Sequence, residues 1–189
     1  MTFIETVTED EASGATAEMY AADREAQGFL PNFTRAFSLR PEAYGAWKQL
    51  NGAIKNGMDL RRYEVATLAA ATRLRSSYCT LAHGSMLMDR GFLEPDVVRA
   101  AVSDHRTAGL DAIDVAVMDL AEKVVDDATA VEQTDVDRLR SLGLSDQEIL
   151  DVVLAAAARC FFSKVLDAVG AEPDAKYDEL DPALRVGRR

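Results

Sequence analysis

The chain has 189 residues, 48% of them hydrophobic and 28% charged, which is enough to bury the core of one globular domain. Its formal net charge of −11 opposes binding to nucleic acid phosphates and to anionic membrane surfaces. The basic end at 185–189 is too short to reverse this balance, and we expect it to be a solvated tail.

The composition also bears on the cellular compartment. Residues 1–5 have neither a basic start nor an apolar run, so no signal peptide is expected. No window holds 18 uncharged apolar residues, so no transmembrane helix is expected either. The two cysteines, Cys79 and Cys160, fit a reducing compartment better than a disulfide framework. We therefore predict a cytoplasmic protein.

Helical periodicity runs through almost the whole chain, and no sustained strand alternation is present. Gly28 is expected to stop the first helix, Pro41 suits the first turn of the second, and Asp59 can cap the third. An apolar connector is expected at 29–33 and a loop at 104–109. In chain order, the expected helices cover about 9–27, 41–54, 60–75, 77–90, 111–127, 134–141 and 145–169, with a break at 76–77 and a further short helix that starts at 94–95.

The last of these helices carries the clearest local signal. Ser145 and Glu148 form a capping box, and Leu144 with Ile149 forms the hydrophobic staple. The helix is apolar on most faces, so we expect it at the centre of the core.

These elements predict a single-domain, all-α helical bundle. We divide it into an N-terminal helical segment at 1–57, a helical core at 58–170 and a C-terminal tail at 171–189. The tail is polar but includes three large apolar residues, so it either drapes over a neighbouring subunit or is loose. These residues are Tyr177, Leu180 and Leu184.

The plausible reactive groups lie in a stretch without charged residues, 76–88. Cys79 and His83, with Tyr78 beside them, are spaced i and i+4, which puts the thiol and the imidazole on one helix face. If Ser76 caps the helix, Cys79 falls in the first turn, where free N–H groups and the helix dipole favour a thiolate. The imidazole can take the thiol proton. The alternative is that Cys79 is a small buried hydrophobe.

Glu64 is the only charged residue between Tyr63 and Thr72, in an Ala-rich helix that we expect to be buried. It is either a general base or proton relay with a raised pKa, or it faces solvent or pairs with Arg61 or Arg62.

We expect neither a metal nor a cofactor. Cys79, His83 and Glu64 offer at most three ligands, whereas structural zinc sites use four. The remaining histidine, His105, is expected in a solvated loop.

The order Glu64, then Ser76-Ser77-Tyr78-Cys79, then His83 resembles the signature of the alkylhydroperoxidase D-like (carboxymuconolactone decarboxylase) family. That signature has a Glu, a Cys-x-x-Cys pair twelve residues on, and a His four past the second Cys. In this register Cys79 is the family's peroxide-facing cysteine. Further segments resemble the peroxidase-related branch, namely 29–32, 40–42, 161–170 and 181–185.

The resemblance implies an all-α fold, obligate homo-oligomers (dimers, trimers or hexamers) and disulfide-cycling peroxidase chemistry. In that chemistry Glu and His deprotonate the peroxide-facing Cys, and the first Cys resolves the sulfenic acid. Here Ser76 replaces the first Cys, and Tyr78 stands where some members have His. Resolution then falls to Cys160, whose alternative role is core filler, or to an external thiol that prevents over-oxidation.

Three functions follow from this reading. The first is a one-cysteine peroxidase with a small peroxide substrate and an external thiol reductant. Its site comprises Cys79, His83 and Glu64, with Ser76 and Tyr78 at the altered positions. The second is an acid–base enzyme that uses Glu64 and His83 on a small carbonyl compound. The third is a helical oligomer without catalytic activity that binds a small ligand or senses redox state.

Overall fold

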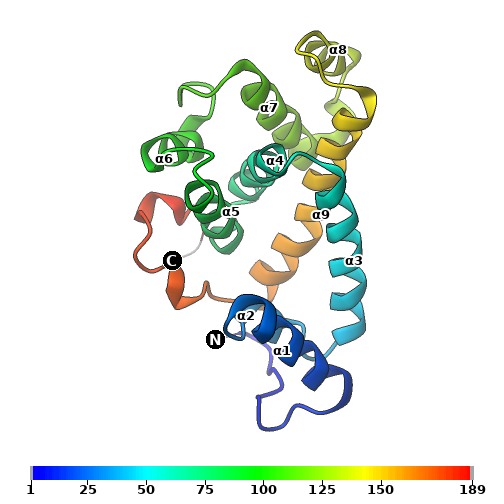
Figure 1. The fold of residues 1–189 in the computed structure, drawn as a ribbon, viewed down its shortest axis with the longest axis vertical. Helices are drawn as coiled ribbons and strands as arrows, with labels where there is room; N and C mark the ends of the chain where they lie inside the picture. The colour runs from blue at the N-terminus through cyan, green and yellow to red at the C-terminus, as the bar shows by residue number, and fades with distance from the viewer. Residues whose placement is uncertain (1, 188–189) are drawn as a thin grey trace.

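Helices form all of the regular structure in residues 2–187, the part of the chain that this computed structural model describes (Figure 1). The expected all-α fold is confirmed. In chain order the α-helices are α1 (Gly14–Gln27), α2 (Asn32–Ala36), α3 (Pro41–Gly57), α4 (Leu60–Arg73), α5 (Ser77–Asp89), α6 (Pro95–Asp104), α7 (Ala112–Asp127), α8 (Gln133–Ser141) and α9 (Asp146–Val169). The short 3-10 helices are η1 (Ala128–Ala130), η2 (Ala175–Tyr177) and η3 (Pro182–Leu184). None of the described helices is both long and apolar enough to cross a membrane.

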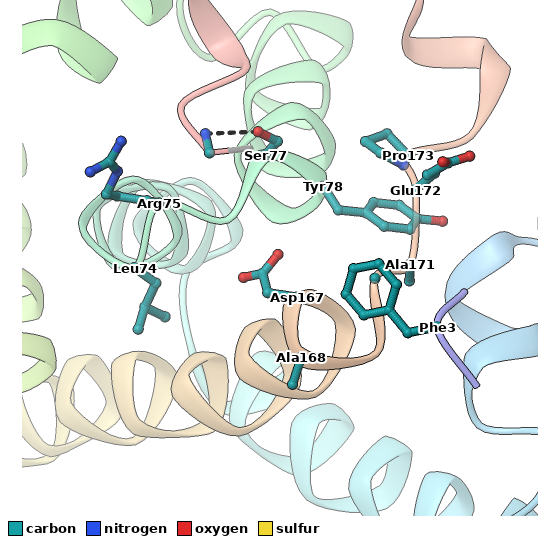
Figure 2. A pocket seen from close by; sticks show the side chains of 12 residues that line it. Phe3, Leu74, Arg75, Ser77, Tyr78, Asp167, Ala168, Ala171, Glu172 and Pro173 are labelled. Atoms are coloured by element: carbon teal, nitrogen blue, oxygen red, sulfur yellow. Dashed lines mark hydrogen bonds between the residues drawn. The ribbon is translucent and has the colours of Figure 1, made fainter. Parts of the chain in front are cut away.

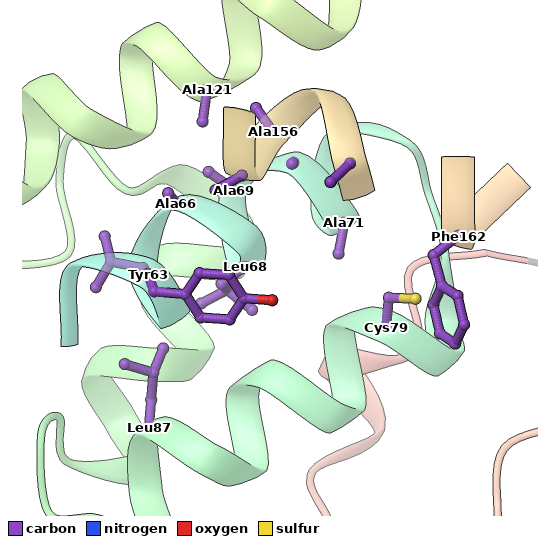
Figure 3. Close-up of a cluster of buried hydrophobic side chains, with 14 of the residues drawn as sticks. Tyr63, Ala66, Leu68, Ala69, Ala71, Cys79, Leu87, Ala121, Ala156 and Phe162 are labelled. Carbon is purple, nitrogen blue, oxygen red and sulfur yellow. The ribbon is translucent and has the colours of Figure 1, made fainter. Parts of the chain in front are cut away.

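Helix α4 lies at the centre of the core, packed against α5, α7 and α9 (Figure 1). Residues 63–71 of this helix are all buried. Many of them are alanines, and small side chains let neighbouring helix axes approach closely. Figure 3 shows Ala66 and Ala69 of α4 near Ala121 of α7 and Ala156 of α9. This close packing carries Glu64, which lies in the same run, into the interior.

Helix α9 begins with the predicted capping box. Ser145 Oγ accepts a hydrogen bond from the Glu148 N–H at 3.3 Å, and the Glu148 carboxylate accepts one from the Ser145 N–H at 2.8 Å. Gly170 ends the helix in the left-handed conformation, with φ 70°. The helix packs against α3, α4 and α7, as its central position requires. One apolar face remains exposed, formed by Leu150, Leu154 and Phe161.

The first helix starts at Gly14, so the prediction of a start near Glu9 was wrong. The Glu9 carboxylate pairs with Arg24 of α1 and with Arg35 of α2. These ion pairs hold the segment around Glu9 against α1 and α2, so this segment does not continue α1 toward the N-terminus.

The segment 29–33, expected to be a connector, contains the start of the short helix α2. The N–H of Asn32, its first residue, donates to Asp174 Oδ1 at 2.8 Å. A carboxylate at this position satisfies a free N–H group and is favoured by the helix dipole. Because the acceptor lies 142 positions away in the sequence, the local pattern gives no sign of it.

His105 is buried, with 2% of its surface exposed, so its expected place in a solvated loop was wrong. Its ring lies against α7, with Nε2 3.0 Å from Asp119 Oδ1 and Nδ1 3.6 Å from Glu122 Oε1. The two carboxylates, one helical turn apart, draw the ring inward.

The tail packs against its own chain over the described residues, so the alternative of a loose tail was wrong, whereas contact with a neighbouring subunit stays a prediction. Tyr177 and Leu184 are 5% and 1% exposed. Leu184 fits against Gly84 of α5, where an added Cβ would lie 2.8 Å from Leu184 Cδ2. Residues 188 and 189 of the basic end lie outside the described residues.

Replacing Leu184 with alanine should therefore lower the free energy of unfolding by about 2–5 kcal/mol, because it empties a buried site. Denaturant unfolding of Leu184→Ala measures the loss. Glu179→Ala, at an exposed position of the same tail, is the matched control and should stay within about 0.5 kcal/mol of the parent. Equal stability of the two variants would contradict the packing described here.

Candidate active site

Cys79 lies in the first turn of α5, as predicted, because the helix begins at Ser77. The thiol is buried, with 2% of the residue exposed, and its Sγ accepts a hydrogen bond from Arg159 Nη1 of α9 at 3.8 Å. Figure 3 shows the Cys79 side chain facing the ring of Phe162, which also comes from α9. The packing of α5 against α9 thus places the Arg159 guanidinium beside the Cys79 sulfur.

Arg159 is buried, with 4% of its surface exposed. Its guanidinium contacts Cys79 Sγ, donates to Tyr63 Oη at 3.3 Å and lies 5.5 Å from the centre of the Phe162 ring. Within residues 2–187 it forms no salt bridge with a carboxylate. Burial opposes the charged form, but the interactions with Cys79 and Tyr63 outweigh it and raise the pKa of Arg159. A buried cation is unfavourable without hydrogen-bond acceptors, and Cys79 Sγ and the Tyr63 hydroxyl are the acceptors in contact with it.

Glu64, His83 and Lys55 form a second charged group beside the first. His83 Nδ1 lies 2.6 Å from Glu64 Oε2, and Lys55 Nζ lies 3.0 Å from Glu64 Oε1. Thr67 Oγ1 is also 3.0 Å from Nδ1. Glu64 is 1% exposed, so the predicted buried carboxylate is confirmed. Its predicted arginine partners were wrong, because the carboxylate faces Lys55 and His83 instead of Arg61 or Arg62.

The expectation of a raised pKa for Glu64 was also wrong. Burial raises the pKa, but His83 and Lys55 outweigh burial and lower it below the usual 4.5. Burial and the nearby Arg159 charge lower the pKa of His83, and they outweigh the opposing effect of Glu64. We conclude that Glu64 is ionised and His83 is neutral. In that state His83 donates from Nδ1 to Glu64 and keeps a free lone pair on Nε2, as a general base requires.

The thiol receives its hydrogen bond from Arg159 and not from His83, within the described part of the chain. Arg159 acts electrostatically on both residues, lowering the pKa of His83 while contacting Cys79. We call Cys79, Arg159, Tyr63, His83, Glu64 and Lys55 the thiol cluster. The sequence analysis missed Arg159, although it is the only charged residue between positions 152 and 163.

Ser76 occupies the N-cap position of α5 and is fully buried, but its hydroxyl makes no capping hydrogen bond. Tyr78 points elsewhere: its hydroxyl donates to Asp174 of the tail and accepts from the Phe33 N–H. Burial and Asp174 together raise the pKa of Tyr78 well above its usual range. The structure therefore gives Tyr78 an anchoring role and does not bring it into the thiol cluster.

Cys160 is half-buried on α9, and burial raises the pKa of its thiol. Successive residues of an α-helix are rotated by about 100°, so Cys160 does not share the face on which Arg159 contacts Cys79.

Outside the thiol cluster, His105, Asp119 and Glu122 place three possible metal-ligand atoms within 4.8 Å of one another. Arg106 pairs with both of these carboxylates, and Arg138 pairs with Asp119. We therefore interpret this group as an ion-pair network that joins α7 to the neighbouring segments.

Residues 41–123 match the model of the carboxymuconolactone decarboxylase family. The matched segment contains Glu64, Cys79 and His83. Over this segment the chain is similar to the carboxymuconolactone decarboxylase family. No curated protein matches the chain by sequence.

Solved structures share the fold of this chain at low sequence identity. The alkylhydroperoxidase AhpD core of a peroxidase-related protein from Ralstonia eutropha JMP134 has a TM-score of 0.85 at 19% identity, covering 99% of this chain and 98% of the other. A peroxidase-related protein from Silicibacter sp. TM1040 gives 0.79 at 22%, covering 94% and 91%. A cysteine-to-alanine variant of the debrominase Bmp8, in complex with 2,3,4-tribromopyrrole, gives 0.74 at 14%, covering 96% and 100%.

The lowered pKa of Glu64 predicts a pH-dependent share of stability. A carboxylate whose pKa is lower in the folded than in the unfolded chain stabilises the fold above the unfolded value, and this contribution disappears as the pH falls through the folded value. The difference in unfolding free energy between the parent and Glu64→Gln should therefore shrink below about pH 4.5. Urea unfolding across this range measures it, with exposed Glu179→Gln as control. A difference that stays constant with pH would contradict the ionised Glu64.

Proposed function

We propose that this protein is a thiol-dependent peroxidase in which Cys79 is the only cysteine that reacts with the peroxide. The observation that carries the proposal is the buried Arg159 guanidinium, which contacts Cys79 Sγ at 3.8 Å and has no carboxylate partner in residues 2–187. The thiolate is the nucleophilic form of cysteine, and a neighbouring arginine stabilises it.

Two of the structures that share the fold are described as peroxidase-related, which supports chemistry of this class for the present chain. The debrominase with the same fold was solved with a cysteine replaced and a small aromatic ligand bound. That complex supports the view that the fold holds small molecules and that a cysteine matters to what it does with them.

The reaction would proceed in three balanced steps. His83 Nε2 accepts the thiol proton, and the Cys79 thiolate attacks one oxygen of a hydroperoxide. A sulfur–oxygen bond forms as the oxygen–oxygen bond breaks, and the leaving oxygen takes the proton to give an alcohol or water. An external thiol then attacks the sulfenic acid, releasing water and leaving a mixed disulfide. A second external thiol releases Cys79 and forms the external disulfide.

Ser76 explains the need for an external reductant, because a serine hydroxyl cannot form a disulfide with Cys79. Cys160 lies on a different face of α9 from the contact with Cys79, which speaks against an internal substitute.

The proposal includes a homo-oligomer. The exposed apolar face of α9 supports it, since Leu150, Leu154 and Phe161 are 55%, 38% and 47% exposed along one side of a single helix. Apolar faces of this kind mark protein–protein contacts.

A second function is favoured by one specific observation. The hydrogen bond between Glu64 and His83 is formed without any participation of Cys79. A neutral imidazole oriented by an ionised carboxylate can transfer protons by itself, as in an acid–base enzyme that acts on a small carbonyl compound.

Peroxide kinetics in a Cys160→Ser background test the first function. We expect Cys79 to be oxidised by hydrogen peroxide and restored by a low-molecular-weight thiol. Arg159→Met should slow the oxidation at neutral pH by roughly tenfold or more, because the sulfur anion loses its charge-assisted partner. Arg159→Lys should retain part of the rate, and Arg138→Met, at an exposed arginine, is the control. An unreactive parent thiol would refute the proposal.

Full turnover of a lactone or β-keto acid by Cys79→Ser would support the acid–base function instead.

Replacing Ser76 with cysteine should convert the proposed one-cysteine mechanism into one that forms an internal disulfide. Positions 76 and 79 are the N-cap and third residue of α5, the spacing of a Cys-x-x-Cys pair. In Ser76→Cys with Cys160→Ser, one equivalent of peroxide should remove both thiols and leave a disulfide that resists over-oxidation, as thiol titration and intact mass can show. Ser103→Cys, at an exposed position of α6, should leave the introduced thiol free. Retention of two free thiols in Ser76→Cys would show that Cys79 does not pass through a sulfenic acid.

A further inference from the structure

Among the described residues, the buried side-chain atoms without a hydrogen-bond partner include four from the start of α5 and the C-terminal half of α9. They are Ser76 Oγ at the N-cap of α5, Thr80 Oγ1 of α5, and Arg159 Nε and Ser163 Oγ of α9. Ser76, Thr80 and Ser163 have no exposed surface at all. Buried polar atoms are hydrogen-bonded in the great majority of cases, so these groups have unused capacity to hydrogen-bond a small polar ligand.

Two contacts fix how the helices lie alongside each other. Arg159 meets Cys79 at 3.8 Å, and Asp167, eight residues further along α9, interacts with Ser76. Burial raises the pKa of Asp167, and the Ser76 hydroxyl partly offsets this, although it completes no hydrogen bond of good geometry. Ser163 is one helical turn from both Arg159 and Asp167, so it lies between the two contacts.

Asp167 also lines a pocket of about 820 Å³ at the surface. Figure 2 shows Asp167 directed from α9 toward Ser77 and Tyr78 in the first turn of α5. Arg75 and Phe3 contribute to the rim. Ser76 and Ser163 therefore lie between Asp167, which lines this pocket, and Arg159, which contacts the buried thiol. We call Ser76, Thr80, Ser163 and the Nε of Arg159 the polar row.

We propose that the polar row admits and binds the hydroperoxide group of a small, uncharged substrate, and that Ser76 and Ser163 determine this selectivity. The inference rests on the peroxidase function proposed above. A hydroperoxide offers one O–H donor and two acceptor oxygens, and serine hydroxyls both donate and accept hydrogen bonds. Arg159 Nε–H only donates, so it meets an acceptor oxygen at the inner end, beside Cys79 Sγ.

The surroundings set the size and charge of the ligand. Cys79 is 2% exposed, and the Phe162 ring lies against it (Figure 3), so a bulky group beside the reacting oxygens does not fit. Asp167 and Glu172 line the pocket together with Arg75, so its charged side chains are more acidic than basic and disfavour anions. Hydrogen peroxide fits these limits, whereas tert-butyl hydroperoxide exceeds them in size.

Rapid oxidation kinetics of Cys79 in a Cys160→Ser background test the proposal. Ser163→Ala and Ser76→Ala should each slow the reaction with hydrogen peroxide roughly fivefold, the effect of losing one hydrogen bond. Ser163→Thr, which keeps a hydroxyl, should stay closer to the parent. Thr72→Val is the matched control, since Thr72 Oγ1 is also buried and unpartnered but lies on α4. In the parent, hydrogen peroxide should react at least tenfold faster than tert-butyl hydroperoxide.

A second measurement needs no peroxide. Ser163→Val should slow alkylation of Cys79 by iodoacetamide at least fivefold, because it narrows the route, while Thr72→Val should not. Thermal unfolding of each variant shows whether it is folded.

If folded Ser163→Ala is oxidised and folded Ser163→Val is alkylated at the rates of the parent protein, the proposed role of the polar row is refuted. If Cys79 of the parent protein is alkylated normally but does not react with peroxide, the proposed peroxidase function is refuted instead.

Discussion

The burial of the Arg159 guanidinium against the Cys79 sulfur constrains the interior of this protein more than any other contact. A cation without a carboxylate partner is unfavourable in a low-dielectric interior unless an anion and hydrogen-bond acceptors surround it. Sγ and the Tyr63 hydroxyl supply that environment, and the Phe162 ring covers one side. The alanines of α4 make the arrangement possible, because they allow α5 and α9 to approach the same central helix.

The charges of the thiol cluster divide into two sets with different tasks. Lys55 neutralises Glu64, His83 donates a hydrogen bond to it, and Arg159 is left for the thiol. Arg159 also opposes protonation of His83, which keeps the imidazole available as a base. In the proposed mechanism, this arginine would therefore assist the proton transfer as well as stabilise the sulfur. This coupling explains why Cys79 and His83 belong to one site although no hydrogen bond joins them in residues 2–187.

The local patterns of the sequence were sufficient for the helices and for part of the site. The Ser145–Glu148 capping box and the placement of Cys79 in a first turn depend on neighbours within one helical turn, so they could be predicted. The start of α2 and the burial of His105 depend on carboxylates from other elements, and these could not. Arg159 could have been noticed as a lone charge in an apolar helix, the signal that identified Glu64.

The tail carboxylate of Asp174 has a consequence for the order in which the molecule assembles. It joins the start of α2 to Tyr78, the residue before the thiol, across separations of 142 and 96 positions. Contacts this distant in sequence close large loops and slow folding. During synthesis, Cys79 therefore emerges long before the residues that shield it. Until the C-terminal segment docks, the thiol lacks the neighbours that bury it in the folded protein.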